Sequence, residues 1–595
     1  MFFSAYVGDD VGLPRWRESL AQHARWLGLE ARTETRRLND CRTLGLGWLE
    51  RGGGPAGPAA GRRGLIERNQ QVVAGVLVFD GPTWSSDANA ATLTALLARS
   101  EVRVAVPPAS PQQVFYAETQ HGYVFADDLR LFRHVLDVDL DDRGVYALLR
   151  YGAVPPTLTI YAQVRRIPNG HELRLLPGRE PECSPVMREA DPPRDGAPVP
   201  PERWLSDTLD ATLARVPPST VLYFSGGVDS SLLAARLSQL GRHDVRLVNY
   251  CFGREDTESP LAARVAAHLG LECHQVRHEL REVAQVLERV DRDYSFPFGD
   301  LSTIPTNILV HGSLPLADES RTVIEGTGAD GAFGFGVEYR KWQRLYAIPR
   351  PLRRWAETTY RALRLWRYDS GVERAGRLLS RSAQLSLGQA VVAQNALERV
   401  AYTTPDDIQA QLRQAIHANF EVLNTGTDPR DHLSFLDLVW VCAGRMAPKS
   451  FDPLRGRGIR PIYPFLQPAM VAGSSALSWD AKCTAGEKKA LLKRLLARHI
   501  PPEWVYRPKS GFTRPAHAVF AEPTMQDYLH DVVLSPGNPL LDYCRRDTVR
   551  QLVERSRHRA LGVGAYNFLW ALTFTSGWLR RPPRIAARVR VATLA

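Results

Sequence analysis

The stretch Val221-Leu-Tyr-Phe-Ser225-Gly-Gly-Val-Asp229-Ser-Ser231 decides how this chain is interpreted. Its first four residues are apolar, as expected of a buried parallel strand, and Leu232-Leu-Ala-Ala-Arg-Leu continues as an amphipathic helix. The turn between them is rich in Ser and Gly. Gly226 and Gly227 let backbone amides approach an anion closely, and the start of the helix adds its dipole. The stretch therefore predicts a phosphate-binding loop.

Asp229 places a carboxylate where a phosphate would lie, an arrangement that requires a cation such as Mg²⁺ between the two. The loop lacks the G-x-x-x-x-G-K-[ST] pattern, so it is not a Walker loop. A Gly-Gly pair alone would fit an ordinary tight turn between strand and helix. The full string resembles the pyrophosphate loop of the ATP pyrophosphatases, which split ATP into AMP and pyrophosphate to activate a carboxylate.

Composition places the chain among soluble globular proteins. The 595 residues leave room for several domains, and 44% hydrophobic with 23% charged residues is ordinary. The net charge of +11 comes from scattered residues without a zinc-finger or RNA-binding signature. A solvated basic surface is therefore favoured over nucleic-acid binding, and attraction to ATP or an acidic peptide is the functional alternative.

Cysteine spacing and hydropathy indicate a cytoplasmic protein. The seven cysteines are scattered without a C-x-x-C pair, which favours reduced thiols over disulfides or a zinc site. The N-terminus shows no signal peptide. No apolar run is long enough to span a membrane, and residues 566–575 are predicted to form a core helix.

The pattern of apolar runs divides the chain. In residues 1–177, short runs such as 102–106 and 122–125 alternate with turns, which predicts an α+β domain with antiparallel sheets. Residues 178–201 are rich in Pro, Glu, Asp and Arg and are predicted to be a linker. Residues 202–595 alternate helix and strand, as in a doubly wound α/β sheet, with a mainly helical insert at 340–420.

Two further motifs carry reactive side chains. Thr322-Val-Ile-Glu325-Gly-Thr-Gly-Ala-Asp330-Gly is a second strand-to-turn motif that ends in an acid. Asp229 and Asp330 at adjacent strand ends would share one Mg²⁺ bridging the phosphates of ATP. Lys509 lies on a loop between prolines and glycine, where its ammonium would neutralise charge on a tetrahedral intermediate. Taken alone, these motifs would be a capped glycine turn and a solvated lysine.

The three motifs in this order resemble the asparagine-synthetase-like superfamily of carboxylate-activating amide synthetases, over nearly the whole chain. Arg445-Met-Ala, Ile462-Tyr-Pro-Phe-Leu-Gln-Pro468 and Glu487-Lys-Lys-Ala-Leu-Leu-Lys match its intervening landmarks. The resemblance implies a glutaminase-like (Ntn-type) sandwich domain followed by an α/β ATP-pyrophosphatase (adenine nucleotide α-hydrolase-like) synthetase domain.

The resemblance also implies roles for particular residues. The catalytic lysine would be Lys509, and the Mg²⁺ ligands would be Asp229 and Asp330. Pyrophosphate would be held by Ser225, Gly226, Gly227, Asp229 and Ser230, and the backbone at Phe224, Tyr250, Glu325 and Gly326 would contact ATP.

Departures from the family pattern concern the substrates. Members that use glutamine carry a cysteine after the initiator Met, whereas this chain has Phe2, and Cys41 is not terminal. The first domain is therefore predicted to be a degenerate glutaminase, and ammonia from glutamine is not the attacking amine. Thr327 stands where asparagine synthetases carry Glu and β-lactam synthetase Tyr, and Gly331 replaces an acid. These changes favour a larger or differently held substrate.

A synthetase without an ammonia source needs an amine already on its substrate. Lasso-peptide cyclases, which close a macrolactam within a precursor peptide, are the favoured match, because the insert at 340–420 suits a peptide. A leader-binding protein and a leader peptidase are candidate partners; nucleic acid and a membrane span are not expected. The alternatives are cyclisation of a small β-amino acid by a β-lactam-synthetase-like enzyme, a glutamine-independent asparagine-synthetase-like amide ligase, and a catalytically silent peptide-binding scaffold.

Overall fold

The computed structural model describes residues 2–39, 42–50, 66–68, 71–75, 92–96, 101–176, 178–185, 199–252, 256, 258–277, 282–334, 339–362, 375, 378–379, 382–383, 404–422, 429–484, 487–507, 516–558 and 561–580. Cys41 and Lys509 lie outside these ranges.

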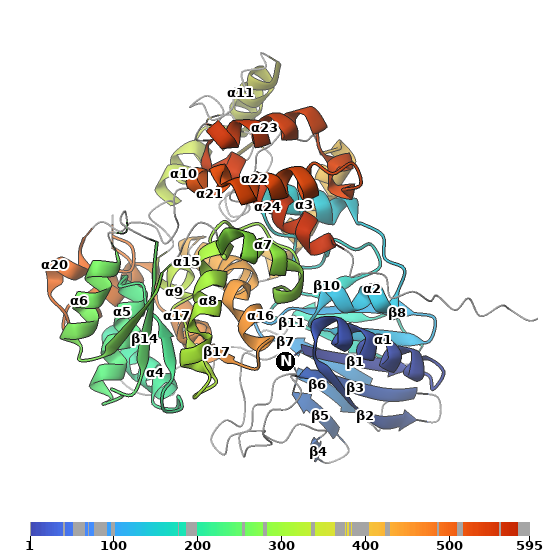
Figure 1. Cartoon of the computed structure of the whole chain (residues 1–595), viewed down its shortest axis with the longest axis horizontal. Helices are drawn as coiled ribbons and strands as arrows, with labels where there is room; N and C mark the ends of the chain where they lie inside the picture. Colours follow the sequence, from blue (N-terminus) through green and yellow to red (C-terminus); the bar gives the residue numbers. More distant parts are fainter. Residues whose placement is uncertain are drawn as a thin grey trace, which may run out of the picture.

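The first part of the chain contains two six-stranded sheets, ordered β10-β8-β9-β1-β3-β2 and β12-β11-β7-β6-β5-β4 (Figure 1). The strand pairs are antiparallel, in agreement with the predicted α+β organisation. The strands are β1 (Phe2–Gly8), β2 (Glu30–Asn39), β3 (Arg42–Glu50), β4 (Ile66–Arg68), β5 (Gln71–Gly75), β6 (Thr92–Leu96), β7 (Glu101–Val106), β8 (Val114–Thr119), β9 (Gly122–Ala126), β10 (Arg165–Ile167), β11 (His171–Leu175) and β12 (Glu182–Pro185). The helices here are α1 (Gly12–Leu27), η2 (Leu129–Leu131), α2 (Phe132–Val135) and α3 (Asp142–Tyr151).

The two sheets pack face to face because side chains alternate along each strand. On β1, Phe3, Ala5 and Val7 enter a core shared with Val104 and Leu173 of the second sheet. Strand β12 pairs with β11 and lies inside the stretch 178–201 that composition predicts as a linker. Its polar sequence fits an edge strand, where side chains meet water rather than a core.

The second part is built on a five-stranded parallel sheet, ordered β15-β14-β13-β16-β17. Its strands are β13 (Val221–Tyr223), β14 (Arg246–Cys251), β15 (Glu272–Arg277), β16 (Thr322–Ile324) and β17 (Arg460–Ile462). Val221 and Tyr223 enter one hydrophobic core, whereas Leu222 and Phe224 enter another. Helices therefore cover both faces, as predicted for a doubly wound sheet.

Helices surround this sheet (Figure 1). Up to residue 362 they are α4 (Pro201–Leu213), α5 (Val228–Gln239), α6 (Ser259–His268), α7 (Glu282–Asp293), α8 (Thr303–Ala317), α9 (Ala329–Phe333), α10 (Tyr339–Tyr346) and α11 (Arg350–Ala362). Beyond it lie α14 (Asp406–Val422), α15 (Pro429–Leu436), the π-helix η3 (Asp437–Met446), α16 (Pro448–Arg455), η4 (Pro464–Leu466), α17 (Pro468–Ala476), α18 (Trp479–Lys482), α19 (Ala490–Leu496), α20 (Pro502–Val505), α21 (Ala516–Ala521), α22 (Pro523–Tyr528), η5 (Leu529–Val533), η6 (Pro539–Tyr543), α23 (Arg546–His558) and α24 (Val563–Leu579).

The order of the strands predicts where a ligand binds. The chain runs from β13 outward through β14 to β15, then returns to place β16 on the other side of β13. Connections that leave neighbouring strands in opposite directions open a crevice at the carboxyl ends of those strands. The loop after β13 and the motif after β16 both begin at this crevice.

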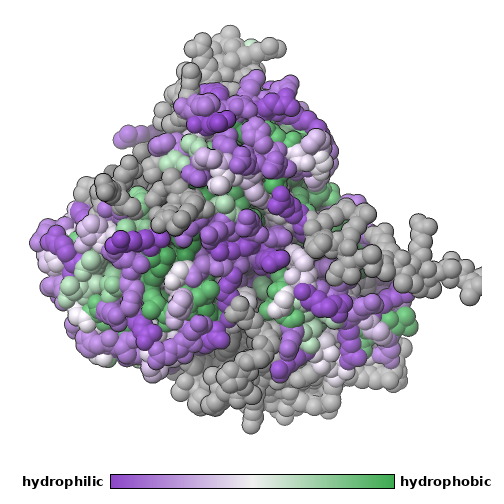
Figure 2. All heavy atoms as spheres, viewed as in Figure 1, coloured by the Kyte–Doolittle hydropathy of each residue, from purple (hydrophilic) through white to green (hydrophobic). Residues whose placement is uncertain are grey.

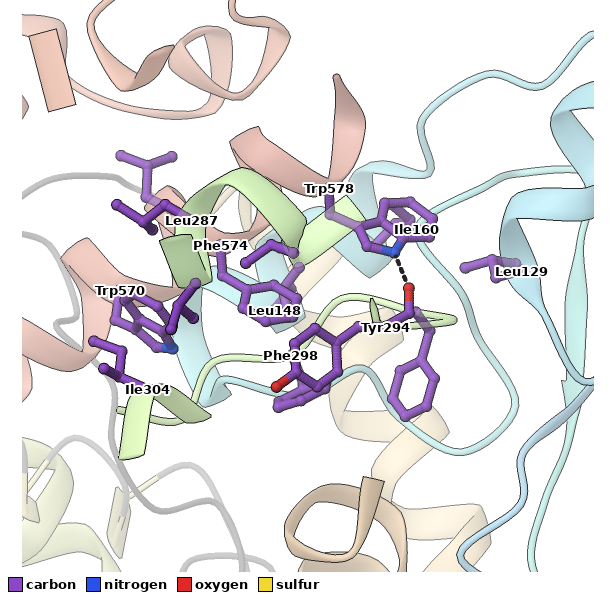
Figure 3. Packing of buried hydrophobic residues seen from close by; sticks show 14 of the residues in the cluster. Leu129, Leu148, Ile160, Leu287, Tyr294, Phe298, Ile304, Trp570, Phe574 and Trp578 are labelled. Carbon is purple, nitrogen blue, oxygen red and sulfur yellow. Dashed lines mark hydrogen bonds between the residues drawn. The ribbon is translucent and has the colours of Figure 1, made fainter. Parts of the chain in front are cut away.

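One hydrophobic core joins the two parts of the chain. Leu148 and Ile160 of the first part pack with Tyr294, Phe574 and other apolar residues of the second (Figure 3). The indole of Trp578 donates a hydrogen bond to the carbonyl oxygen of Tyr294 at 2.8 Å. Helix α24 is thus a buried core helix, as predicted for residues 566–575, and no helix in the described ranges is long and apolar enough to cross a membrane.

Candidate active site

The loop after β13 is tightly curled against α5 and α6. Gly226 has φ +68°, and a Cβ at this position would lie 2.9 Å from Cα of Ala262. The amide of Ser225 donates to Oγ of Ser230 at 3.1 Å, and the amide of Gly227 donates to Oγ of Ser225 at 3.3 Å. Glycine is thus required at 226 both by its backbone conformation and by the close approach of α6.

The two predicted metal ligands meet at this crevice. Oδ2 of Asp229 and Oδ1 of Asp330 each lie 2.7 Å from Nζ of Lys489. The other oxygen of Asp229, Oδ1, is buried and has no hydrogen-bond partner. Two carboxylates converging on one cation, with a spare oxygen, fit a Mg²⁺ ion. No group of three or more His, Cys, Asp or Glu among the described residues could enclose a metal, so Asp229 and Asp330 would supply only part of its coordination.

Lys489 was not predicted as a site residue. In the sequence it appears only within residues 487–493, one of the stretches that match the family. Its backbone is left-handed, with φ +58°, and its amide donates to the carbonyl of Phe333 at 3.0 Å. Burial alone would lower the pKa of Lys489, but the carboxylates of Asp229 and Asp330 outweigh burial and raise it. A strained backbone at a permanently charged lysine is typical of a functional position.

A cavity of about 420 Å³ opens at the crevice, within the size range of small-ligand sites. Asn249 lies in its wall beside the loop after β13: its Nδ2 donates to the carbonyl of Phe224 at 2.8 Å, while its Oδ1 is buried without a partner. The sequence pattern did not single out Asn249. The predicted residues that line the cavity are Phe224, Ser225, Asp229, Ser230, Tyr250, Glu325, Gly326, Thr327 and Asp330.

Hydrogen bonds hold the second motif, residues 322–331, in the cavity wall. Oγ1 of Thr327 donates to the carboxylate of Glu325 at 2.5 Å, and the hydroxyl of Ser450 donates to the other oxygen of Glu325. Burial raises the pKa of Glu325. Gly326 lets the first motif approach, since a Cβ there would lie 3.3 Å from Cβ of Asp229. The Thr327 hydroxyl is therefore engaged with Glu325 while its side chain lines the cavity.

The cavity is also lined by charged residues that sequence reasoning did not assign. Nζ of Lys449 lies 3.4 Å from the carboxylate of Asp300, and Nε of Arg445 lies 3.9 Å from it. Burial would raise the pKa of Asp300, but these two cations lower it to about 2. Asp437, on the π-helix, has the opposite shift: burial and the charge of Asp330 raise its pKa to about 7.

The loop that carries the predicted lysine begins beside the cavity. Arg507 is the last described residue before 508–515, and its Nη2 lies 2.5 Å from the carboxylate of Glu258, which lines the cavity. Lys509 itself lies outside the described residues, and its catalytic role stays a prediction.

The start of β1 offers a contrast with this cavity. Phe2, where glutamine-using relatives carry cysteine, is 2% exposed. The guanidinium of Arg455 lies 4.3 Å from the centre of its ring and pairs with Asp127 at 2.5 Å. The position is filled by an aromatic side chain packed between the two parts of the chain.

The family model for asparagine synthase matches residues 204–580. The chain belongs to the asparagine synthase family. A putative glutamine-hydrolyzing asparagine synthetase of Mycobacterium bovis is 24% identical over 397 residues, which cover 64% of this chain and 59% of that protein. The asparagine synthetase of Bos taurus is 36% identical over 113 residues, or 18% of this chain and 20% of that protein. This family member thus spans less than two thirds of the length of these relatives.

Solved structures resemble this asparagine synthase family member only locally. The NH3-dependent NAD synthetase of Campylobacter jejuni covers 23% of this chain and 59% of its own, with a TM-score of 0.18 and 18% identity. An allosteric regulatory enzyme of purine biosynthesis covers 47% of this chain and 80% of its own, with a TM-score of 0.21 and 11% identity. Scores this low carry no conclusion about this chain.

Proposed function

We propose that this protein is an ATP-dependent amide ligase that closes a macrolactam in a ribosomal precursor peptide. ATP adenylates an Asp or Glu side chain of the peptide, and the N-terminal amine of the same peptide attacks the acyl-adenylate. An amide forms, AMP leaves, and pyrophosphate has left in the first step. The observation that carries the proposal is the coexistence of an intact acid pair at the crevice with a buried Phe2 in the first domain.

The described residues suit the adenylation step. Phe224 and Tyr250 line the nucleotide end of the cavity, and the Ser225–Ser230 loop offers amides and hydroxyls to pyrophosphate. Asp229 and Asp330 would hold Mg²⁺, which when bound neutralises charge on the phosphates. Lys489 adds a cation beside the same acids, and Lys509 is proposed to stabilise the tetrahedral intermediate.

The cavity residues outside the phosphate-binding loop suit an amine that arrives on the substrate. Thr327 offers no charge to an aspartate substrate, and its hydroxyl is bonded to Glu325. The carboxylate of Asp437 makes no ion pair with a described residue, and the thiol of Cys442 donates to it at 3.9 Å. Because Asp437 lines the cavity, its carboxylate could bind a substrate ammonium.

Holding both reacting ends of one peptide in this cavity would supply most of the rate enhancement through proximity. The arginine- and tryptophan-rich sequence at 340–420 supports a peptide substrate. A leader-binding protein and a leader peptidase are proposed partners of such a reaction, and the cytoplasm is its proposed location.

The second candidate is cyclisation of a small β-amino acid, as in β-lactam synthetase. The cavity volume of about 420 Å³ favours it, because this lies toward the lower end of the range for ligand sites. A glutamine-independent amide ligase of the asparagine synthetase type is less favoured, since Thr327 lacks the charge to hold free aspartate. A silent scaffold is disfavoured by the retained Asp229 and Asp330.

The test combines intact-mass analysis with an AMP assay. A linear peptide with a free N-terminus and an internal Asp or Glu is incubated with the protein and Mg-ATP, and a parallel reaction contains a small β-amino acid. Loss of one water from the peptide with stoichiometric AMP is expected. Turnover of the β-amino acid alone would move the assignment to the second candidate, and no AMP with any substrate would identify a scaffold.

Two lysine variants refine this test. Lys509→Ala is expected to abolish the cyclic product while leaving ATP binding largely intact, because its ammonium acts on the intermediate. Lys493→Ala is the matched control, since Nζ of Lys493 pairs with Glu487 at 3.1 Å, outside the cavity lining. Unimpaired turnover by Lys509→Ala would remove the lysine from the mechanism.

A further inference from the structure

Helix α11 buries charge and exposes apolar side chains, the reverse of an ordinary surface helix. Arg353 and Glu357 are only 7% and 6% exposed. Leu352 and Trp355, on the same helix, are 56% and 69% exposed. Water contact with a tryptophan is unfavourable, so this orientation needs an explanation.

Helix α23 shows the ordinary arrangement. It buries Val549, Leu552 and Val553, and its hydrophilic side chains face outward at the top of the molecule (Figure 2). Helix α11 lies farther out than α23 in Figure 1. The two helices therefore present opposite kinds of side chain to water.

The orientation of α11 is fixed by its buried face. Nε of Arg353 donates to the carbonyl of Ile348 at 2.9 Å, and its Nη1 donates to the carbonyl of Ser382. The same guanidinium lies 4.2 Å from the centre of the Tyr346 ring. Turning Trp355 inward would break these contacts of Arg353, so the buried face of α11 keeps Trp355 exposed.

Exposed apolar side chains are concentrated here. Seven large hydrophobic residues are classed as exposed in the described ranges, and four of them, Ile348, Leu352, Trp355 and Leu378, lie within about thirty residues. Arginines alternate with them at the surface. We define the arginine–tryptophan surface as Arg344, Ile348, Arg350, Leu352, Arg354 and Trp355, all of them exposed.

Within the described ranges, acidic side chains are scarce on the segment that carries this surface. Among residues 339–362 the only acid is Glu357, which is buried. Arg344 and Arg354 form no ion pair with any residue that the structure describes. A partner that carries carboxylates would complement the charge of these two arginines.

We propose that the arginine–tryptophan surface docks a partner polypeptide that presents carboxylates around an apolar patch. Tryptophan and arginine dominate the binding energy of protein interfaces, and an exposed tryptophan flanked by arginines matches that composition. The carboxylates pair with Arg344, Arg350 and Arg354, and the apolar patch receives Leu352 and Trp355. This docking goes beyond the proposed ligase reaction and does not depend on it.

A polypeptide fits this surface better than a membrane or a nucleic acid. Helices that lie on membranes separate a basic face from an apolar face, whereas Arg354 and Trp355 are both exposed next to each other on α11. Nucleic acids offer phosphates and base faces, but no aliphatic partner for Ile348 and Leu352. Only a folded or helical polypeptide supplies both acids and aliphatic contacts at this scale.

The experiment uses a fluorescein-labelled dodecapeptide of Glu, Asp, Leu and Phe, titrated with the full-length protein and followed by fluorescence anisotropy. Comparison probes are the same peptide with Lys in place of its acids, phosphatidylserine vesicles, and a single-stranded oligonucleotide. We expect saturable binding of the acidic peptide that weakens with salt. Trp355→Ala and Arg354→Glu should each weaken binding by at least about tenfold.

Val11→Ala and Arg550→Glu are the matched controls, because Val11 and Arg550 are exposed elsewhere on the molecule. Both should bind as the unaltered protein does, and all four variants should keep its melting temperature. Equal peptide binding by Trp355→Ala and the unaltered protein would overturn the proposal, as would tighter binding of vesicles or oligonucleotide. Self-association that disappears in Trp355→Ala would assign the surface to a second copy instead.

Discussion

The start of β1 and the loop after β13 differ in how their buried polar atoms are satisfied. At β1, one carboxylate oxygen of Asp127 accepts from the amide of Phe3 at 2.7 Å, and the other accepts from Gln112 and Arg455. At the crevice, Oδ1 of Asp229 and Oδ1 of Asn249 are buried without a partner. Both residues line the cavity, so a bound ligand is a candidate partner for these two atoms.

The difference separates a region that is filled by packing from one that is open to a ligand. The acids at the crevice cost stability unless a cation or ligand neutralises them. Phe2 and its surroundings contribute to stability through packing and offer no reactive group to a substrate. Activity should therefore respond to changes at the crevice, and stability to changes at β1.

The largest effect is expected from Asp229→Asn, which removes the charge at nearly constant shape. AMP formation should fall by roughly 10²–10³-fold, because charge stabilisation of the phosphates is lost. Asp210→Asn is the matched control, since Asp210 pairs with Arg236 at 2.5 Å on another face of α5. Unchanged AMP formation by Asp229→Asn would place the metal elsewhere.

Lys489→Ala tests the same site through stability. Without the ammonium, Asp229 becomes a buried unpaired carboxylate, so the free energy of unfolding should fall by about 3 kcal/mol. Millimolar Mg²⁺ should restore part of this loss, and the melting temperature of the variant should rise more with Mg²⁺ than that of the unaltered protein. Lys493→Ala should cost less than about 1 kcal/mol and show no added response to Mg²⁺.

Phe2→Ala tests the other side of the comparison. Removing this buried ring should lower the free energy of unfolding by about 3 kcal/mol, whereas Phe2→Leu should cost less than about 1.5 kcal/mol. At a temperature where both variants are folded, their AMP formation should match that of the unaltered protein. A fully stable Phe2→Ala that lacks activity would contradict the division between packing and chemistry.

The smallest effect concerns Asp437 and depends on pH. The pKa of its carboxyl is raised from an ordinary 3.8 to about 7, so the folded protein binds this proton more tightly than the unfolded chain. The contribution of the protonated Asp437 carboxyl to the free energy of unfolding is complete below about pH 4. It is lost as the pH rises through about 7. Asp437→Asn should therefore gain roughly 1–2 kcal/mol over the unaltered protein at pH 8, and nothing at pH 4.

Chemical denaturation at the two pH values measures this difference. A gain that is equal at both would indicate altered packing rather than a removed charge. Asp542→Asn serves as the control because Asp542 is exposed in its pair with Arg546, and its stability difference should be small at either pH.

Local sequence patterns predicted the crevice because each of its main parts lies within a short, continuous stretch of sequence. The apolar run at 221–224, the glycines after it and the acids 229 and 330 each report a strand end, and parallel strands bring such ends together. The antiparallel sheets and the buried helix α24 were predicted from alternation and apolar runs for the same reason.

Contacts between distant segments could not be predicted in this way. Lys489 reaches Asp229 across 260 residues from a left-handed backbone position that no local pattern encodes. Asp437 and Asp300 line the cavity only because a π-helix and a loop meet there. Strand β12 was not predicted, because its sequence is polar. The pairing of Phe2 with Arg455 likewise depends on how the two parts pack.

The late position of α24 in the sequence determines when its contacts can form during synthesis. The guanidinium of Arg133 donates to the carbonyl of Trp578, 445 residues further along the chain, and lies 4.1 Å from the centre of its indole. At ribosomal speeds of roughly 5–20 residues per second, the two are synthesised about 20–90 s apart. During that interval the apolar side of the first domain has no partner from α24. Molecular chaperones that shield nascent chains are thus expected to hold this domain until translation reaches its final helix.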